Sequence, residues 1–137
     1  MTKADLVGKL VVLTGNGTVG LGTENDVIKG VVVTEPSKME AGGVFVHGFE
    51  GIEDTVTMKL DATTATALGL VGDYQVAVKK SVTVEDVVIS ATTAKQPTFG
   101  KYVLADGKGG VVVSATATTA YADVVDTTSK LAVITIL

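Results

Sequence analysis

The sequence predicts a mainly β protein, built from small barrel-like or sandwich-like units with one short helix. Val and Thr together supply 45 of the 137 residues, and such β-branched side chains favour strands over helices. Short apolar runs are separated by turns rich in glycine. Apolar residues make up 46% of the chain and charged residues 19%, which favours a folded core over disorder.

The first half of the chain contains four expected strands. The first ends at the glycine turn 15–17, and the second ends before Pro36. In the fourth, Val56, Met58 and Leu60 alternate with polar residues, a pattern typical of a half-buried strand. These strands are expected at residues 9–14, 27–34, 44–49 and 54–61.

The one short helix is expected at residues 61–69. Asp61 suits the N-cap position, and Gly69 suits the position after the last helical turn. Residues 91–98 contain Pro97 and are expected to form an exposed loop, and residues 106–110 form a strong glycine turn. The remaining strands are expected at residues 73–79, 81–89, 101–105, 111–115, 121–125 and 131–137.

An internal repeat is visible when the two ends of the chain are aligned. Residues 8–19 read GKLVVLTGNGTV and residues 100–111 read GKYVLADGKGGV. At the same offset, residues 37–38 fall on 129–130, and with a slip of one residue 31–32 fall on 124–125. Chance similarity between Val-rich strands is the alternative. We favour a structural pseudo-repeat of two β-units, residues 8–49 and 100–137.

The predicted organisation is an N-terminal arm, residues 1–7, followed by a single β-rich domain, residues 8–137. The middle segment, residues 50–99, carries the short helix and joins the two β-units.

Residues 15–20 fit the G-x-G-x-x-G pattern of dinucleotide-binding proteins. That mechanism needs a helix directly after the turn. Gly20 and Gly22 are poor helix formers, so we interpret the pattern as a hairpin turn.

Composition excludes several classes of function. The chain has no Arg, 11 Lys, 15 carboxylates and a net charge of −4, which argues against nucleic-acid binding. It has no Cys and a single His, His47, so thiolate or multi-His metal sites and a catalytic triad are excluded. The adjacent carboxylates at 53–54 and 85–86 are expected in solvent. We therefore expect no enzymatic activity and no cofactor or metal.

No apolar run reaches the length of a membrane-spanning helix, so no membrane contact is expected. The first six residues lack the apolar core of a secretory leader, so we expect synthesis in a cytoplasm. Only 4% of residues are aromatic and none is Trp, which disfavours an aromatic platform for sugars.

Several segments resemble the head decoration, or cement, proteins of tailed bacteriophages. They are the Gly-Lys strand and glycine turn of residues 8–17, IKGVV at 28–32, GVFVHG at 43–48 and GKYVLADG at 100–107. The resemblance implies a non-enzymatic virion protein, made in the host cytoplasm. It implies a homotrimer on the outer capsid surface, where it binds the major capsid protein and links neighbouring capsomers.

Two sets of contact residues are expected. In the resembling family an N-terminal arm often binds the coat protein, which suggests a capsid contact formed by Thr2, Lys3, Ala4, Asp5 and Leu6. The last strand is apolar on both faces, which suggests a subunit contact at Ile134, Ile136 and Leu137. Alternative functions are a tail-tube or head–tail joining subunit, a surface adhesin or carbohydrate-binding module, and a small acid–base enzyme.

Overall fold

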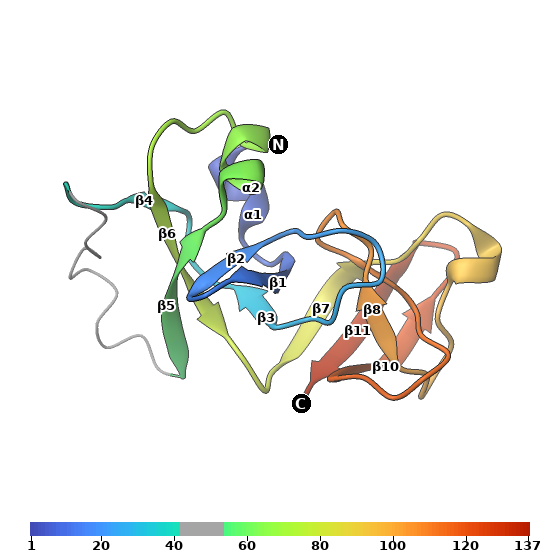
Figure 1. Ribbon diagram of the computed structural model, residues 1–137. Coiled ribbons are helices and arrows are strands. Elements are labelled where there is room, and N and C mark those ends of the chain that lie inside the picture. The colour runs from blue at the N-terminus through green and yellow to red at the C-terminus, as the bar shows by residue number, and fades with distance from the viewer. Residues whose placement is uncertain (42–53) are drawn as a thin grey trace.

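The first β-unit is a closed ring of strands. In the computed structural model, which describes residues 1–41 and 54–137, its strands pair in the order β3-β1-β2-β5-β6, and β6 pairs back to β3 (Figure 1). All neighbours are antiparallel except β2 and β5, which are parallel. The strands are β1 (Leu10–Gly15), β2 (Thr18–Gly20), β3 (Gly30–Val32), β5 (Thr55–Leu60), β6 (Tyr74–Lys79) and a short β4 (Ser37–Lys38) beside β6.

The expected helix is confirmed as α2 (Ala62–Ala67). The Asp61 carboxylate accepts a hydrogen bond of 2.7 Å from the backbone N–H of Thr64, which satisfies a donor left free by the first helical turn. Gly69, with φ of +72°, follows the last turn, as expected of the residue that ends a helix. Local sequence alone therefore defines both ends of this helix.

The second β-unit consists of two sheets joined by single bridges. Strands β10, β11 and β7 form one sheet, and β8 and β9 form a hairpin. A parallel bridge joins Ile89 to Val111, and an antiparallel bridge joins Tyr102 to Tyr121, which completes a second ring of neighbours. The elements are β7 (Thr83–Val88), the 3-10 helix η2 (Thr93–Lys95), β8 (Val103–Ala105), β9 (Val111–Val113), β10 (Ala120–Asp126) and β11 (Leu131–Ile136).

The hairpins of the two units share one register. Val12 faces Gly20 in the first hairpin, and Leu104 faces Val112 at the equivalent place in the second. Val19 of β2 then pairs in parallel with β5, just as Val111 of β9 bridges in parallel to the residue that follows β7. The repeated sequence of residues 8–19 and 100–111 therefore corresponds to repeated structure.

The equivalence extends to the third strand, with a different offset from the one expected. The backbone N–H of Gly8 donates to the carbonyl of Val32, and that of Gly100 donates to the carbonyl of Ala122, both at 2.8 Å. Val32 is thus equivalent to Ala122, and the expected match of residues 31–32 with 124–125 was wrong. The match of 37–38 with 129–130 was also wrong, because the former lie in β4 and the latter in the β10–β11 turn.

The expected division into 8–49, 50–99 and 100–137 differs from the structure. Strands β5 and β6 complete the first ring, and β7 belongs to the second. In the second unit, β7 occupies the place that β5 has in the first. In the sequence β7 precedes the β8–β9 hairpin, whereas β5 follows the β1–β2 hairpin. Local patterns cannot reveal this, because long-range pairing decides which ring a strand joins. The expected strand 44–49 and His47 lie outside the described residues.

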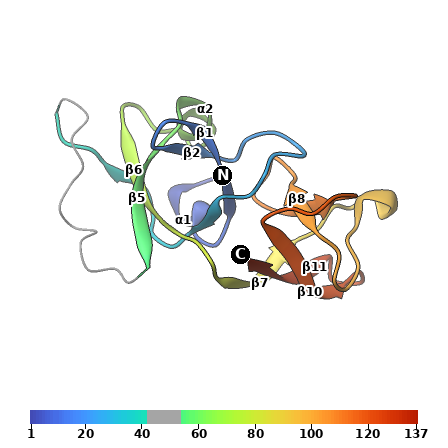
Figure 2. The same ribbon diagram turned by 60° about the horizontal axis from the view of Figure 1, so that its bottom comes forward.

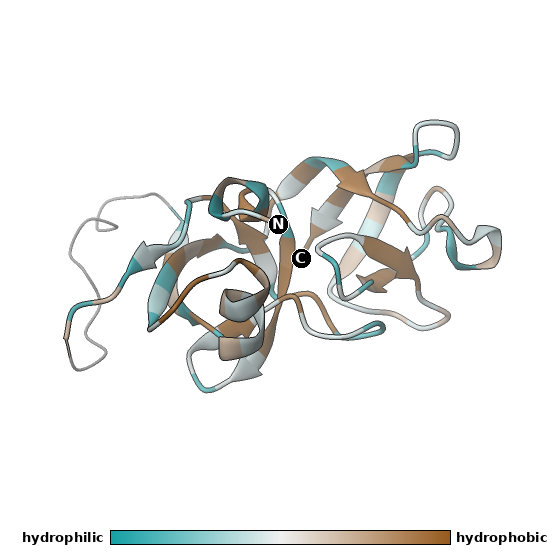
Figure 3. Cartoon of the chain, turned by 90° about the horizontal axis from the view of Figure 1, so that it is seen from above, coloured by the Kyte–Doolittle hydropathy of each residue, from teal (hydrophilic) through white to brown (hydrophobic). Residues whose placement is uncertain are grey.

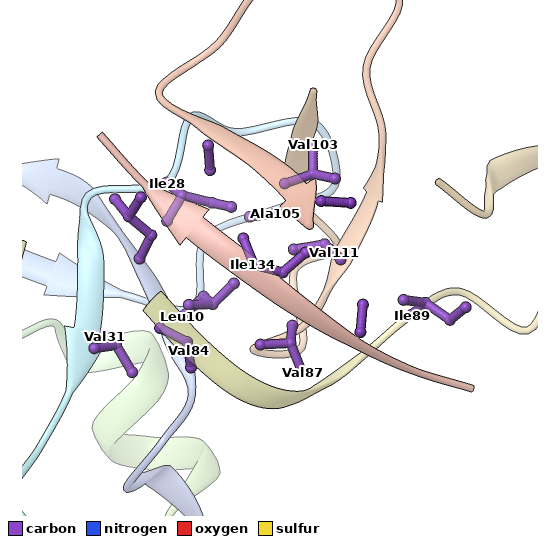
Figure 4. Close-up of a cluster of buried hydrophobic side chains, with 14 of the residues drawn as sticks. Leu10, Ile28, Val31, Val84, Val87, Ile89, Val103, Ala105, Val111 and Ile134 are labelled. Carbon is purple, nitrogen blue, oxygen red and sulfur yellow. The ribbon is translucent and has the colours of Figure 1, made fainter. Parts of the chain in front are cut away.

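The two units share a wall formed by β1 and β3. Side chains alternate across a strand: Leu10 and Val12 pack in the core of the second unit, and Val11 packs in the core of the first. In β3, Val31 packs in the core of the second unit and Val32 packs in the core of the first. Figure 4 shows Leu10 and Val31 meeting side chains of the second unit, and Figure 3 shows apolar segments running through both units.

Candidate functional site

The loop between β2 and β3 is fastened to the second unit by backbone hydrogen bonds. Asn25 donates to the carbonyl of Ala105, and Ala105 donates to the carbonyl of Asp26, both at 2.9 Å. The hydroxyl of Thr119 donates to the carbonyl of Ile28 at 2.8 Å. This loop therefore forms a fixed seam between the two units, on the side where β1 ends.

Leu13 emerges at the seam because β1 leaves the wall between the two cores at this residue. The three residues before it are buried, whereas Leu13 is 51% exposed. Val27, on the seam loop, is 54% exposed. Two large aliphatic side chains thus face outward from a part of the chain whose backbone is held on both sides.

Leu13 separates two hollows. The larger one, of about 500 Å³, lies between the end of β1, the seam loop and α2, and Leu21, Asp61 and Ala67 contribute to its lining. The smaller one, of about 290 Å³, is lined by Val27, Lys29 and Thr119 among others. Leu13 and Asp26 line both. We call the area around these hollows the seam surface, formed by Leu13, Leu21, Asp26, Val27, Lys29 and Thr119.

The carboxylates beside the larger hollow serve local structure. Asp26 Oδ2 accepts hydrogen bonds from the backbone N–H of Thr23 at 2.8 Å and from its hydroxyl at 3.1 Å. Asp61 caps α2, and the hydroxyl of Thr64 accepts the backbone N–H of Leu21 at 3.1 Å. These contacts fix the shape of the seam surface and leave Asp26 and Asp61 poorly placed for acid–base catalysis.

The G-x-G-x-x-G segment forms the β1–β2 hairpin, as expected; its last three residues are β2, and no helix directly follows them. Its third glycine has a packing role. A Cβ on Gly20 would collide with the side chains of Asp61 and Thr64. The glycine therefore allows α2 to approach the hairpin, and the pattern needs no nucleotide to explain it.

A pair of lysines lies at one end of the first ring. Lys29 precedes β3 and Lys80 follows β6, the strand that pairs with β3. Partial burial and the neighbouring Lys80 ammonium lower the pKa of Lys29, because both disfavour a second positive charge. This pair was missed in the sequence, since the two residues meet only through the pairing of β3 with β6.

The expected N-terminal arm is partly incorrect. Residues Lys3–Leu6 form the short helix α1, and Leu6 is fully buried in the core of the first unit. It cannot reach a capsid partner without leaving that core. Thr2, Lys3, Ala4 and Asp5 remain exposed, and Asp5 Oδ2 accepts the backbone N–H of Thr2 at 2.8 Å. This hydrogen bond lowers the pKa of Asp5.

The expected subunit contact is also partly incorrect. Ile134 and Ile136 are buried in the core of the second unit, because β11 lies between β10 and β7. These residues and Ala132 form one face of β11, which packs within the protomer, whereas Leu131 and Val133 on the other face are only half-buried. Leu137 alone keeps a large exposed fraction, 63%. Its backbone N–H donates to the carbonyl of Thr119 at 2.7 Å, so it borders the seam surface.

Within residues 1–41 and 54–137, no group of three or more His, Cys, Asp or Glu side chains is placed to hold a metal ion. The adjacent Glu85 and Asp86 are both exposed, as expected. None of the helices in this part of the chain is long and apolar enough to cross a membrane.

Comparisons with family models, curated proteins and solved structures found no match to this chain.

Proposed function

We propose that this protein is a non-enzymatic virion component that binds the outer surface of a tailed-phage capsid. Its partner is the major capsid protein, and its role is to stabilise the shell by linking neighbouring capsomers. The sequence resemblance to head decoration proteins suggests this role, and the seam surface supplies a place for the contact.

The observation that carries the proposal is the outward placement of Leu13 and Val27 on a fixed backbone. Each side chain is about half exposed and stands beside a hollow. Exposed apolar side chains grouped around hollows are typical of interaction sites. Because the seam loop is already held by hydrogen bonds to the second unit, docking would order little additional backbone, which favours affinity.

The charge of the chain supports a position outside the shell. The interior of a filled capsid is dominated by the phosphates of packed DNA. A chain with no Arg and a net charge of −4 gains nothing from counterion release and is repelled there. On the outer surface the same charge limits sticking between particles.

The proposal includes a homotrimer, as the family resemblance implies. Of the expected contact residues, Leu137 retains exposed surface next to the seam, so the subunit contact and the capsid contact would adjoin. Sedimentation equilibrium of the free protein tests this part of the proposal. A trimer is expected, and a strict monomer at high concentration would contradict it.

Co-sedimentation with undecorated mature shells of the phage that carries the gene tests the binding itself. Saturable binding is expected, with stronger retention on expanded shells than on precursor shells. Leu13→Asp should abolish or strongly weaken binding, because it places a charge in an apolar contact. The matched control is Val124→Asp, at a strand residue of similar exposure, 58%, on the far unit.

The outcomes separate the seam from a general loss of stability. All three proteins are first compared by thermal unfolding, so that only folded variants enter the binding assay. Loss of binding in Leu13→Asp but not in Val124→Asp supports the proposal. Equal binding of Leu13→Asp and wild type would contradict docking through the seam surface, and no binding of the wild-type protein to any shell would contradict the capsid function.

A further inference from the structure

The register of the first hairpin turns the backbone of Leu13 away from β2. Leu13 faces Val19 in the β1–β2 pairing, and the carbonyl of Val19 accepts the backbone N–H of Asp61 at 2.8 Å. The polar groups of Val19 therefore face β5 and not β1. In an antiparallel ladder the residue opposite such a position also directs its N–H and C=O outward. Those of Leu13 are thus directed to the side of β1 on which β3 lies.

That side of β1 has no strand beside Leu13. In the pairing of β1 with β3 the matched residues of β1 are Leu10 and Val11. The last hydrogen bond between the two segments joins the N–H of Lys29 to the carbonyl of Val11 at 2.7 Å. Among the described residues, none forms a hydrogen bond with the N–H or C=O of Leu13. Leu13 therefore forms an open strand edge beside the smaller hollow, which it lines.

The second unit has the same kind of edge at Ala105. Ala105 faces Val111 in the β8–β9 pairing, and the carbonyl of Val111 accepts the N–H of Ser90 at 3.3 Å. Val111 is thus turned away from β8, just as Val19 is turned away from β1. The polar groups of Ala105 are therefore directed outward, and Ala105 is the structural equivalent of Leu13.

In the second unit this edge is covered by the seam loop. The N–H of Asn25 donates to the carbonyl of Ala105, and the N–H of Ala105 donates to the carbonyl of Asp26. An antiparallel bridge lies beside these two bonds, and Figures 1 and 2 both show the loop after β2 reaching β8. With this segment in place Ala105 is 1% exposed, whereas Leu13 is half exposed. The chain itself thus shows how such an edge is filled.

We propose that an extended segment of the coat protein pairs with Leu13 as the seam loop pairs with Ala105. The segment lies antiparallel to β1 beyond the end of β3, exchanges two backbone hydrogen bonds with Leu13 and places one side chain in the smaller hollow. Val12, Val27 and Ile28 are among the residues that line this hollow, so an aliphatic side chain fits it. The inference rests on the proposed function, because it names the form in which the partner is bound at the same surface.

The chemistry of the edge favours a partner chain in extended conformation. Unpaired groups of a strand edge are a template for another strand; main-chain hydrogen bonds then supply affinity, and side-chain pockets supply specificity. A second copy of this chain is a poorer occupant. Its loop after β9 corresponds to the seam loop, but the hydroxyl of Ser114 already binds the N–H of Thr116 at 3.2 Å and its carbonyl at 2.8 Å.

Hydrogen exchange of the free protein tests whether the edge is open. The amide of Leu13 should exchange early and that of Ala105 should be protected, because only Ala105 is hydrogen bonded. Protection of both amides at low protein concentration would show a closed edge and overturn the inference. Protection of Leu13 that rises with protein concentration would assign the edge to a second copy and would overturn it as well.

Hydrogen exchange on shells tests the partner. Decorated mature shells are placed in deuterated buffer, the protein is released after increasing times, and the remaining amide protons are located by NMR. Leu13 should become protected on the shell. Ala117, an exposed residue of the loop after β9, is the control, and its amide should exchange equally fast in the free and bound protein.

A backbone substitution tests the hydrogen bond itself. Replacement of the Leu13 amide by an ester removes the N–H and retains the side chain. Because this N–H has no partner among the described residues, the ester should leave Tm unchanged, yet it should weaken shell binding about fivefold through the loss of one hydrogen bond. The same replacement at Ala117 should leave both Tm and binding unchanged.

The outcomes distinguish failure of this inference from failure of the proposed function. Wild-type binding in which Leu13 still exchanges early, or in which its ester binds as tightly as wild type, would overturn the strand pairing and leave the capsid function standing. If the wild-type protein binds no shell at any stage, the capsid function and the coat-protein segment are both overturned.

Discussion

Leu6 offers the sharpest test of how the N-terminal segment is used. Its side chain is fully buried in the core of the first unit. The backbone is held on both sides of Leu6, because Asp5 N–H donates to the carbonyl of Thr2 at 3.1 Å and Gly8 N–H donates to that of Val32 at 2.8 Å. The site therefore cannot collapse freely when the side chain is shortened. Leu6→Ala should lower the free energy of unfolding by about 3 kcal/mol.

That loss would be a large fraction of the stability of a domain of this size, which is on the order of 5–15 kcal/mol. It should appear as a fall in Tm of about 10 °C. Urea unfolding followed by circular dichroism measures the change at constant temperature, with the m-value as a check that the unfolded state is unaltered. The control is Val7→Ala, at a neighbouring residue that is exposed, which should cost less than about 1 kcal/mol.

Removal of residues 1–7 extends the test. If the segment belongs to the fold, the truncated chain should be at least as destabilised as Leu6→Ala, before any partner is added. If these residues acted only as a mobile arm, both changes would leave the unfolding curve of the free protein unaltered. A change of less than about 0.5 kcal/mol for Leu6→Ala would refute the reasoning.

Three further changes test other parts of the fold. Ile134→Ala, in the buried β11, should lower the stability of the protomer by about 2–5 kcal/mol; a changed oligomeric state in urea-free buffer with an unchanged protomer stability would indicate a subunit contact instead. Asp61→Ala removes the N-cap of α2 and should lower the free energy of unfolding by about 1 kcal/mol, measured by thermal or urea unfolding. Asp61→Asn should retain most of the stability that the cap provides, because Asn also caps helices well. Backbone N–H groups of Ser129 and Thr128 lower the pKa of Asp126, so its contribution to stability should be complete above its ordinary pKa of 3.8 and should fade as the pH falls through the lowered value. Unfolding of wild type and Asp126→Asn between pH 5 and pH 2 checks this, and an identical pH dependence would contradict it.

Features that depend on local sequence could be predicted. The β1–β2 hairpin follows from its glycine turn, and α2 follows from Asp61 and Gly69. The repeated hairpin at residues 100–111 was found because the same turn chemistry recurs after the same Gly-Lys strand. These elements need only a few neighbouring residues to specify them.

Features that depend on distant pairing could not be predicted. The apolar run at Ile134 and Ile136 is compatible with a buried strand or with a subunit contact, and only the position of β11 between β10 and β7 decides between them. The short segment before β1 gives too few residues for its periodicity to show that Leu6 is buried. An alternating strand buries one face wherever it pairs, so the pattern of β5 does not reveal which ring it joins.

The seam surface was missed for the same reason. Leu13 continues an apolar strand in the sequence, and nothing in that pattern distinguishes it from the buried residues before it, yet it is exposed beyond the wall shared by the two units. Lys29 and Lys80 are far apart in the sequence and come to the same end of the first ring through the pairing of β3 with β6. Sequence patterns give the type of each strand, whereas surfaces formed between strands depend on their partners.

Imaging tests the central claim, that this protein docks on the outside of a phage shell through its seam surface. Undecorated mature shells are incubated with the purified protein and examined by electron cryomicroscopy. The account predicts regular density on the outer surface, with Leu13 and Val27 turned toward the coat protein. Density only inside the shell, density confined to the tail, contact through a face far from the seam, or bare shells at saturating protein would contradict it.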